Sequence, residues 1–328
     1  MSVPLFNDSV RAALRKIASE TLSVLEAKSY TIPGNGSHDL RRGMDASEAD
    51  TRYYSPDSSA LSGWSSHAGG GTFSKYFTAP KAPAAAPTAV TSILQISTID
   101  CARLLHNIHR NNNPDGHDKI GVLNFASATK PGGGFIGGAR AQEESIARAS
   151  TLYPTLLTND AQEFYQLHKA DERDGFYTHA IVYSPGVVVF RDDSGGWTEP
   201  LEVDVLTCAA VNAGEVRRSP RGRSSGAEDK IEREMTERMG RLLYLFEKEG
   251  VKDIVLGSFG TGVFRNNVSV IARMWADLLA VPGARFGSSF ERVMFAIIDE
   301  RTLAEFETAF NARTSGGRGG AAPLRADL

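Results

Sequence analysis

The stretch 123–154, LNFASATKPGGGFIGGARAQEESIARASTLYP, decides the fold class. It continues an apolar run, KIGVLNF (119–125), which predicts a buried strand. A glycine-rich loop follows the strand, and a helical pattern begins near Gln142. In α/β proteins, loops that leave the carboxyl ends of strands in this way bind ligands. We therefore predict an α/β fold with a binding site in this loop.

Strands and helices alternate along most of the remaining chain. Short apolar runs predict strands at 90–96, 119–125, 179–184, 186–191, 201–211, 253–259 and 292–298. Helical periodicity predicts helices at 98–110, 160–169, 227–249, 267–280 and 301–311. Residues 97–100 supply a capping sequence for the helix at 98–110. Six or seven strands interleaved with helices predict a mixed sheet that is covered on both faces.

The ends of the chain follow other patterns. Residues 7–28 predict a docking helix, with apolar side chains on one face at Val10, Leu14, Ile17 and Val24. From 29 to 89 the periodicity fades, and a Pro/Ala run, TAPKAPAAAPTAV (78–90), is typical of an extended linker. We expect three parts: an N-terminal helical extension with a Gly/Pro/Ala-rich linker (1–89), a catalytic domain (90–312) and a disordered tail (313–328).

Composition excludes several classes of protein. The net charge of −3 over 328 residues leaves no general attraction for polyanions, so we expect no sequence-specific nucleic-acid binding. The two distant cysteines, Cys101 and Cys208, support neither a disulfide framework nor a thiolate metal site. No signal peptide or membrane span is evident, so we expect a soluble, intracellular protein with no membrane partner. No apolar heptad demands a partner chain, and a monomer is expected.

The glycine-rich loop and the carboxylates after it allow two interpretations. Gly132, Gly133 and Gly134 are either a flexible turn or an anion-binding concavity with unobstructed N–H groups. Glu143 and Glu144 are either acidic residues that a helix N-terminus favours, or a catalytic pair. A bound phosphate and a second carboxylate raise the pKa of a carboxyl group toward that of a proton donor, whereas the helix N-terminus lowers it. We adopt the catalytic interpretation because the pair follows a loop of the phosphate-binding type.

A second glycine-rich passage, VLGSFGTGVFRNN (255–267), also leads from a strand into a helix and suits a pyrophosphate. It matches neither the nucleoside-triphosphate nor the dinucleotide fingerprint. Phe264 is either a core residue or an aromatic that packs on a ribose. The arginines at 217, 218, 221 and 223 lie in a stretch, 216–230, that we interpret as a mobile solvated loop in preference to a polymer contact.

These motifs together resemble the microbial branch, bacterial and fungal, of the poly(ADP-ribose) glycohydrolases. The triple glycine, seven residues and then Gln142-Glu143-Glu144 resembles the signature of that family. The phrases YSPGVVVFRDDSG (183–195), TCAAVNAG (207–214), 255–267 and VMFAIID (293–299) follow in the order expected there. The resemblance covers residues 90–310.

The resemblance implies a macrodomain-like fold, a three-layer α/β/α sandwich. It implies hydrolysis of the ribose–ribose O-glycosidic bonds of poly(ADP-ribose), in exo mode, with ADP-ribose as product and no cofactor or metal. The implied partners are poly(ADP-ribose) and poly-ADP-ribosylated proteins. Two alternatives stay open: a non-catalytic ADP-ribose reader, which has no need of Glu144, and a hydrolase of mono-ADP-ribosylated protein or O-acetyl-ADP-ribose.

The resemblance also implies residue roles. Glu144 would protonate the leaving ribose oxygen and then activate water, while Glu143 would orient the ribose. Asn124 would hydrogen-bond the distal ribose, and Gln142 would fix the loop. Close approach to ribose and diphosphate would be allowed by Gly132, Gly133 and Gly134. The diphosphate-binding loop would comprise Gly260, Thr261, Gly262, Val263 and Phe264. For the adenine pocket, Phe295 is a candidate.

Overall fold

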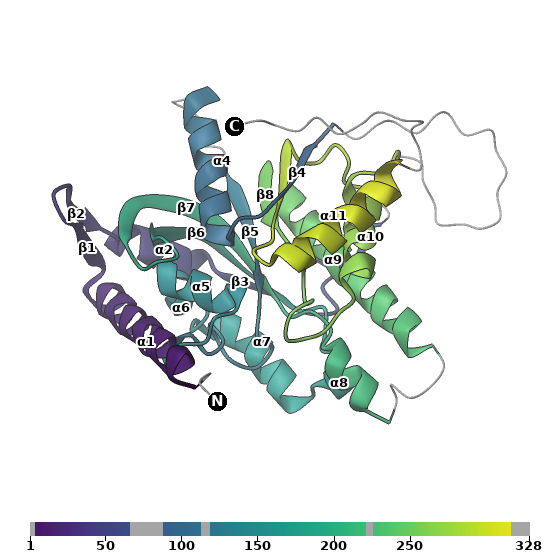
Figure 1. The fold of residues 1–328 in the computed structure, drawn as a ribbon, viewed down its shortest axis with the longest axis horizontal. Helices are drawn as coiled ribbons and strands as arrows, with labels where there is room; N and C mark the ends of the chain where they lie inside the picture. The colour runs from purple at the N-terminus through teal and green to yellow at the C-terminus, as the bar shows by residue number, and fades with distance from the viewer. Residues whose placement is uncertain (1–3, 66–87, 113–118, 221–225, 316–328) are drawn as a thin grey trace.

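A seven-stranded mixed sheet forms the centre of the computed structural model, which describes residues 4–65, 88–112, 119–220 and 226–315 (Figure 1). In spatial order the strands are β3 (Arg52–Tyr54), β6 (Ile181–Arg191), β7 (Trp197–Cys208), β5 (Ile120–Phe125), β8 (Asp253–Leu256), β9 (Arg292–Ala296) and β4 (Val90–Leu94). From β7 to β4 neighbouring strands are parallel, whereas β6 runs antiparallel to both β3 and β7. The predicted mixed sheet is confirmed.

Helices cover both faces of this sheet (Figure 1). One face packs against α9 (Ala227–Lys248), α10 (Val268–Leu279) and α11 (Glu300–Ser315). The other face packs against α4 (Thr98–Asn112), α5 (Gln142–Ala149), α6 (Leu152–Thr155) and α7 (Asn159–Ala170). The three layers confirm the predicted α/β/α sandwich.

Burial on both faces explains why the strands appear in the sequence as unbroken apolar runs. In β9, Val293 and Phe295 join the cluster on the α9–α11 face, while Met294 and Ala296 join the cluster on the α4–α7 face. Successive side chains of a strand point to opposite faces, so a strand covered twice needs apolar residues at every position.

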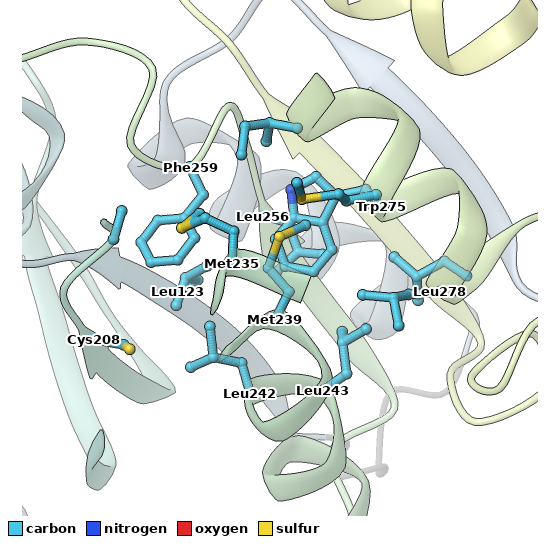
Figure 2. Packing of buried hydrophobic residues seen from close by; sticks show 14 of the residues in the cluster. Leu123, Cys208, Met235, Met239, Leu242, Leu243, Leu256, Phe259, Trp275 and Leu278 are labelled. Atoms are coloured by element: carbon cyan, nitrogen blue, oxygen red, sulfur yellow. The ribbon is translucent and has the colours of Figure 1, made fainter. Parts of the chain in front are cut away.

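The core on the α9–α11 face also supports the start of the second glycine-rich loop. Met239 and Leu242 of α9 pack close to Leu256 of β8, beside Trp275 of α10 (Figure 2). The Trp275 indole Nε1 donates a hydrogen bond of 3.1 Å to the carbonyl oxygen of Gly257. A buried indole N–H requires an acceptor, and here that acceptor holds the residue at which the loop leaves the sheet.

The N-terminal region differs from the predicted linker. Beyond α1 (Pro4–Ala27), it forms β1 (Ser29–Ile32), β2 (Gly36–Asp39), α2 (Arg41–Asp50), β3 and α3 (Ser59–Ser62). Strand β3 pairs with β6, with Arg52 opposite Tyr183. The linker prediction is therefore wrong for 29–65, because such short elements carry no clear periodicity. The glycines at 69–71 and most of the Pro/Ala run lie outside the described residues, and the domain boundaries at 89 and 312 stay predictions.

Three further expectations need correction. The strands predicted at 179–184 and 186–191 form one strand, β6, with a register shift between Ser184 and Val187. A further helix, α8 (Ala213–Arg218), occupies the start of the predicted mobile loop. Helix α11 continues to Ser315, inside the predicted tail. Residues 221–225 and 316–328 lie outside the described ranges. No described helix has the length and apolar character needed to cross a membrane.

Candidate active site

The site lies at the carboxyl edge of the sheet, where the neighbouring strands β5 and β8 send the chain to opposite faces. After β5 the chain continues to α5 on one face, and after β8 it continues to α10 on the other. Such a divergence opens a crevice between the two loops. A pocket lies in this crevice. Its walls include the two ends of the first loop, at 125–127 and 141–144, but not the triple glycine, together with residues 258–264 of the second loop and residues 296–299 at the end of β9.

Gln142, the first residue of α5, joins the helix to the end of β5. Its Oε1 accepts a hydrogen bond of 2.9 Å from the Phe125 N–H, and its Nε2 donates to the Leu123 carbonyl at 2.7 Å. The same Nε2 lies 3.2 Å from the Thr98 hydroxyl of α4. The amide is therefore fully occupied within the protein, and it sets the position of the two carboxylates that follow it.

Glu144 lines the pocket, and the protein binds one of its two carboxylate oxygens. Its side chain is 8 % exposed, and Oε1 accepts a 2.9 Å hydrogen bond from the Gly134 N–H. Oε2 has no hydrogen-bond partner among the described residues. A Cβ on Gly133, whose φ is +59°, would lie 2.4 Å from Oε1. Glycine is therefore required here both for the left-handed backbone and for the close approach of the carboxylate.

Glu143 is buried beside Glu144, with 2 % of its surface exposed. The pKa of Glu143 is raised to about 8. Burial is the main cause and the neighbouring Glu144 carboxylate adds to it, while hydrogen bonds from Ser127, Asn124 and Gly132 act in the opposite direction. The bond from the Ser127 N–H to Oε2 is 2.7 Å long. At neutral pH, Glu143 is thus the carboxyl group whose protonated form the protein favours.

Asn124, at the end of β5, is fully buried at 0 % exposure. Its Nδ2 donates to the Thr207 hydroxyl of β7 at 3.1 Å, and its Oδ1 has no partner within the described ranges. The structure places this side chain next to Glu143, behind the carboxylates. Contact between Asn124 and a ribose stays a prediction.

The first glycine-rich loop binds the protein's own carboxylates. The N–H groups of Gly132 and Gly134 donate to Glu143 and Glu144 respectively, and the Gly133 N–H donates to the Lys130 carbonyl at 2.9 Å. These donors therefore already face acceptors of the protein in the described chain, and their contact with a ligand stays a prediction.

The second loop, residues 257–267, is more open. Gly260 has a φ of +74°, and a Cβ there would lie 2.4 Å from the Ala210 Cβ. The Asn266 Nδ2 closes the turn by donating to the carbonyls of Gly260 and Val211 at 2.9 and 2.7 Å. In the part of the chain that the structure describes, the N–H groups of Gly262, Val263 and Phe264 have no protein acceptor. They are the donors available to an anion.

The predicted residues of this loop, Gly260, Thr261, Gly262, Val263 and Phe264, all line the pocket together with Gln142, Glu143 and Glu144. Val263 is 81 % exposed where it lines the pocket. Phe264 is partly buried, and its ring centroid lies 5.9 Å from that of Tyr177. The structure thus brings the two sequence-predicted loops together around one pocket.

Two buried residues near the carboxylates, Tyr165 and Arg148, were not predicted from the sequence. Burial raises the pKa of the Tyr165 hydroxyl, and the nearby Glu143 raises it further. The Arg148 guanidinium interacts electrostatically with Glu144. Only the spacing of Arg148, one helical turn after Glu144, was a usable signal. The adenine-pocket candidate Phe295 is wrong, because its fully buried ring packs against Trp275, Phe306 and Phe310 in the core. In the described ranges no group of three or more His, Cys, Asp or Glu is placed to hold a metal ion.

Comparison with known proteins agrees with this geometry. A family model for the catalytic domain of microbial-type poly(ADP-ribose) glycohydrolase (PARG) matches residues 18–192, more than half of the chain. The chain belongs to this family. The match begins within α1 and therefore includes the β1–β3 region. The family assignment confirms the predicted enzyme class and activity: the protein is a PARG.

Solved PARG structures resemble most of the chain. The PARG from Thermomonospora curvata has 34% identity and a TM-score of 0.75, covering 92% of this chain and 99% of its own. The T. curvata enzyme bound to the inhibitor ADP-HPD gives 32% identity and a TM-score of 0.74 over the same shares, 92% and 99%. PARG from Deinococcus radiodurans in complex with ADP-ribose gives 28% identity and a TM-score of 0.66, covering 84% of this chain and 97% of its own. No curated protein matched this PARG.

Proposed function

We propose that this PARG removes ADP-ribose from the free end of poly(ADP-ribose), with Glu144 as general acid and base. The observation that carries the proposal is the Glu144 carboxylate. The Gly134 N–H holds one of its oxygens, the other is buried without a partner among the described residues, and the residue lines the pocket. A buried acceptor without a partner is costly unless a ligand supplies one. The exo mode rests on the resemblance to microbial members of the family.

In the proposed reaction, Glu144 first donates a proton to the leaving ribose oxygen as the bond between that oxygen and the anomeric carbon breaks. The resulting Glu144 carboxylate then takes a proton from a water molecule, whose oxygen bonds to the anomeric carbon. The products are ADP-ribose and a polymer shortened by one unit, and Glu144 ends in its starting protonation state. A negative diphosphate beside a carboxyl group favours the proton-carrying form needed for the first step.

The remaining residues position the substrate in this scheme. The unused N–H groups at 262–264 hold the diphosphate, and Phe264 packs on the terminal ribose. Glu143, supported by Asn124, orients the ribose at the reacting centre. Gln142 acts indirectly, because its amide already bonds β5. Binding of ADP-ribose is supported by the D. radiodurans relative, which was solved in complex with that molecule.

We further propose that the protein acts as a monomer in a reducing, intracellular compartment. Both cysteines, Cys101 and Cys208, are buried free thiols. Burial raises the pKa of each thiol to about 12, so neither is a reactive thiolate at neutral pH. A sedimentation measurement that gave a dimer mass would contradict the monomer.

The test is release of ADP-ribose from automodified poly(ADP-ribose) polymerase. Glu144→Gln keeps an acceptor for the Gly134 N–H but cannot transfer the proton. We expect release to fall by about 100- to 10,000-fold, while ADP-ribose binding in calorimetry changes by less than about threefold. Glu202→Gln, on an exposed position of β7, is the matched control and keeps the wild-type rate.

Each outcome of this assay separates one hypothesis. Release by Glu144→Gln at the wild-type rate contradicts the acid/base assignment. If the wild-type protein binds ADP-ribose but does not cleave it from the polymer, the protein is a reader. Short end-labelled oligomers distinguish the modes of cleavage, because exo cleavage yields only ADP-ribose as a small product whereas endo cleavage yields free oligomers. Faster release from mono-ADP-ribosylated protein than from polymer favours the second alternative.

A further inference from the structure

Helix α1 covers the outer side of the catalytic loop, although it lies more than a hundred residues away in the sequence (Figure 1). The loop segment involved is η1 (Phe135–Gly137) with Gly138 after it. The Arg11 Nε donates a 2.9 Å hydrogen bond to the Gly137 carbonyl. Gly138 has a φ of +78°, and a Cβ there would lie 2.5 Å from the Arg11 carbonyl oxygen. The loop and the α1 backbone are thus in direct contact.

An apolar contact fixes the same segment from the inside. Phe135 is 1% exposed and forms a buried cluster with Ala18 of α1 and Ala147 of α5. The Tyr153 ring packs edge-on against Phe135, with 4.8 Å between the ring centroids. Burial of a phenylalanine side chain is strongly stabilising. The segment is therefore held in one place by α1 and α5 together.

Arg148 of α5 connects this segment to the helix that carries the carboxylates. Its Nη1 donates to the Ala139 carbonyl at 2.5 Å, and its own carbonyl accepts a 2.6 Å hydrogen bond from the Thr21 hydroxyl of α1. The Ala139 N–H in turn donates to the Gly134 carbonyl at 3.2 Å. The next link is the Gly134 N–H, which holds Glu144. A continuous path therefore runs from α1 to the proposed acid.

The guanidinium of Arg148 is held in an unusual environment. Its residue is 6% exposed, and burial lowers its pKa, an effect that the Glu144 carboxylate partly offsets. Its donors are used on a carbonyl and on the Ser145 hydroxyl at 3.4 Å. A buried cation without a hydrogen-bonded carboxylate is destabilising for the fold, so the position calls for another role. The role that the geometry offers is the placement of the loop beside Glu144.

We propose that Arg148 is a positioning residue and that α1 is part of the active-site support: together they hold residues 134–139 so that the Gly134 N–H fixes the Glu144 carboxylate for proton transfer. The proposal rests on the proposed function of Glu144. Helix α1 would then contribute to catalysis although none of its described residues lines the pocket.

The first test separates the loop from α1. Gly138→Ala introduces a side chain that meets the α1 backbone, so the loop must shift while the diphosphate-binding loop stays as it is. A misplacement of about 1 Å at a reacting group costs on the order of 100-fold in rate. We expect kcat for ADP-ribose release to fall about 10- to 100-fold, with KM and the affinity for ADP-ribose changed by less than about threefold. Gly34→Ala is the control, because its φ is +82° and nothing lies within 4 Å of the added Cβ.

The second test addresses Arg148 itself. Arg148→Met keeps the length of the side chain but donates no hydrogen bond to Ala139, and we expect the same loss of kcat with retained ADP-ribose affinity. Arg148→Lys supplies one donor and a charge, so it should recover part of the rate. A purely structural role would instead lower kcat of both variants in proportion to their loss of folded protein, as measured by thermal unfolding.

The outcomes are distinguishable from those for the proposed function. If wild-type protein releases ADP-ribose and Glu144→Gln does not, but Gly138→Ala and Arg148→Met both keep the wild-type kcat, then the positioning role is wrong and the acid assignment stands. If Arg148→Met yields no folded protein, Gly138→Ala decides alone. A rise in KM without a fall in kcat also overturns the proposal, because it places the effect on binding.

Discussion

The two glycine-rich loops of the site use their backbone N–H groups in opposite ways. In the loop after β5, the N–H groups of Gly132 and Gly134 bind Glu143 and Glu144, and the segment is covered by α1. In the loop after β8, the N–H groups at 262–264 have no acceptor within the described chain, and Val263 is 81 % exposed. Similar glycine content thus supports a rigid carboxylate cradle in one loop and an open anion site in the other.

The number of glycines in a loop therefore does not predict what its N–H groups bind. The deciding factor is whether a side chain of the protein reaches the N–H groups first. Gln142 anchors α5 to β5, and this brings two carboxylates over the first loop. No acidic residue occurs within the segment 257–267, so its donors stay free. In the proposed function, the first loop therefore positions the reacting carboxylates and the second binds the diphosphate.

The largest effect is expected when the Glu143 and Glu144 carboxylates are displaced from the first loop. Gly133→Ala places a Cβ 2.4 Å from the Glu144 Oε1 and 2.9 Å from the Glu143 Oε2, in a left-handed backbone that alanine disfavours. We expect kcat to fall by about 100- to 1,000-fold, with a smaller change in KM. Steady-state assays of ADP-ribose release check this. Gly186→Ala is the control, since its φ is +64° and the space around it is open; equal rates for the two variants would refute the requirement.

A second prediction concerns the cost of burying Glu143 in the first loop. Its pKa is raised to about 8, from about 4.5 for an exposed glutamate. The unfolded chain therefore loses this proton at lower pH than the folded chain. The contribution of Glu143 to stability is present in full below about pH 4.5 and is lost as pH rises toward about 8, with a slope of at most about 1.4 kcal/mol per pH unit.

Glu143→Gln mimics the protonated carboxyl group and removes this titration. The unfolding free energy of the variant, relative to wild type, should rise between about pH 5 and pH 8. Urea unfolding at several pH values measures it, and the difference between the two proteins cancels all other titrating groups. Parallel curves across this range would show that Glu143 is not buried in its neutral form.

The smallest effect is expected in the second loop. Gly260→Ala brings a Cβ to 2.4 Å from the Ala210 Cβ and 2.7 Å from the Asn266 Nδ2, so the loop must move. We expect KM and the dissociation constant for ADP-ribose to rise by about tenfold, with kcat within about threefold of wild type. Gly250→Ala, with a φ of +73° and open surroundings, is the control. If only kcat fell, the second loop would not act through substrate binding, and the proposed difference between the two loops would be wrong.

Local patterns predicted much of the fold and both loops. The strands β4, β5, β8 and β9 and the helices α4, α7, α9, α10 and α11 appear close to the predicted positions. The strands are continuous apolar runs and the helices have an amphipathic period, so each pattern is local. The three residues of β3 had no such period. Their hydrogen bonds come from β6, more than a hundred residues away, so only the assembled sheet defines them.

The sequence by itself determined the α/β class, the pairing of a triple glycine with Gln142-Glu143-Glu144 and, through the family resemblance, the PARG assignment. These depend on residue type and on spacing along the chain. Three properties are visible only in the tertiary structure. The N–H groups of the first loop bind Glu143 and Glu144, and the pKa of Glu143 is raised. Helix α1 and Arg148 contact the loop from outside. Those properties depend on burial and on contacts between distant segments, which a linear pattern does not contain.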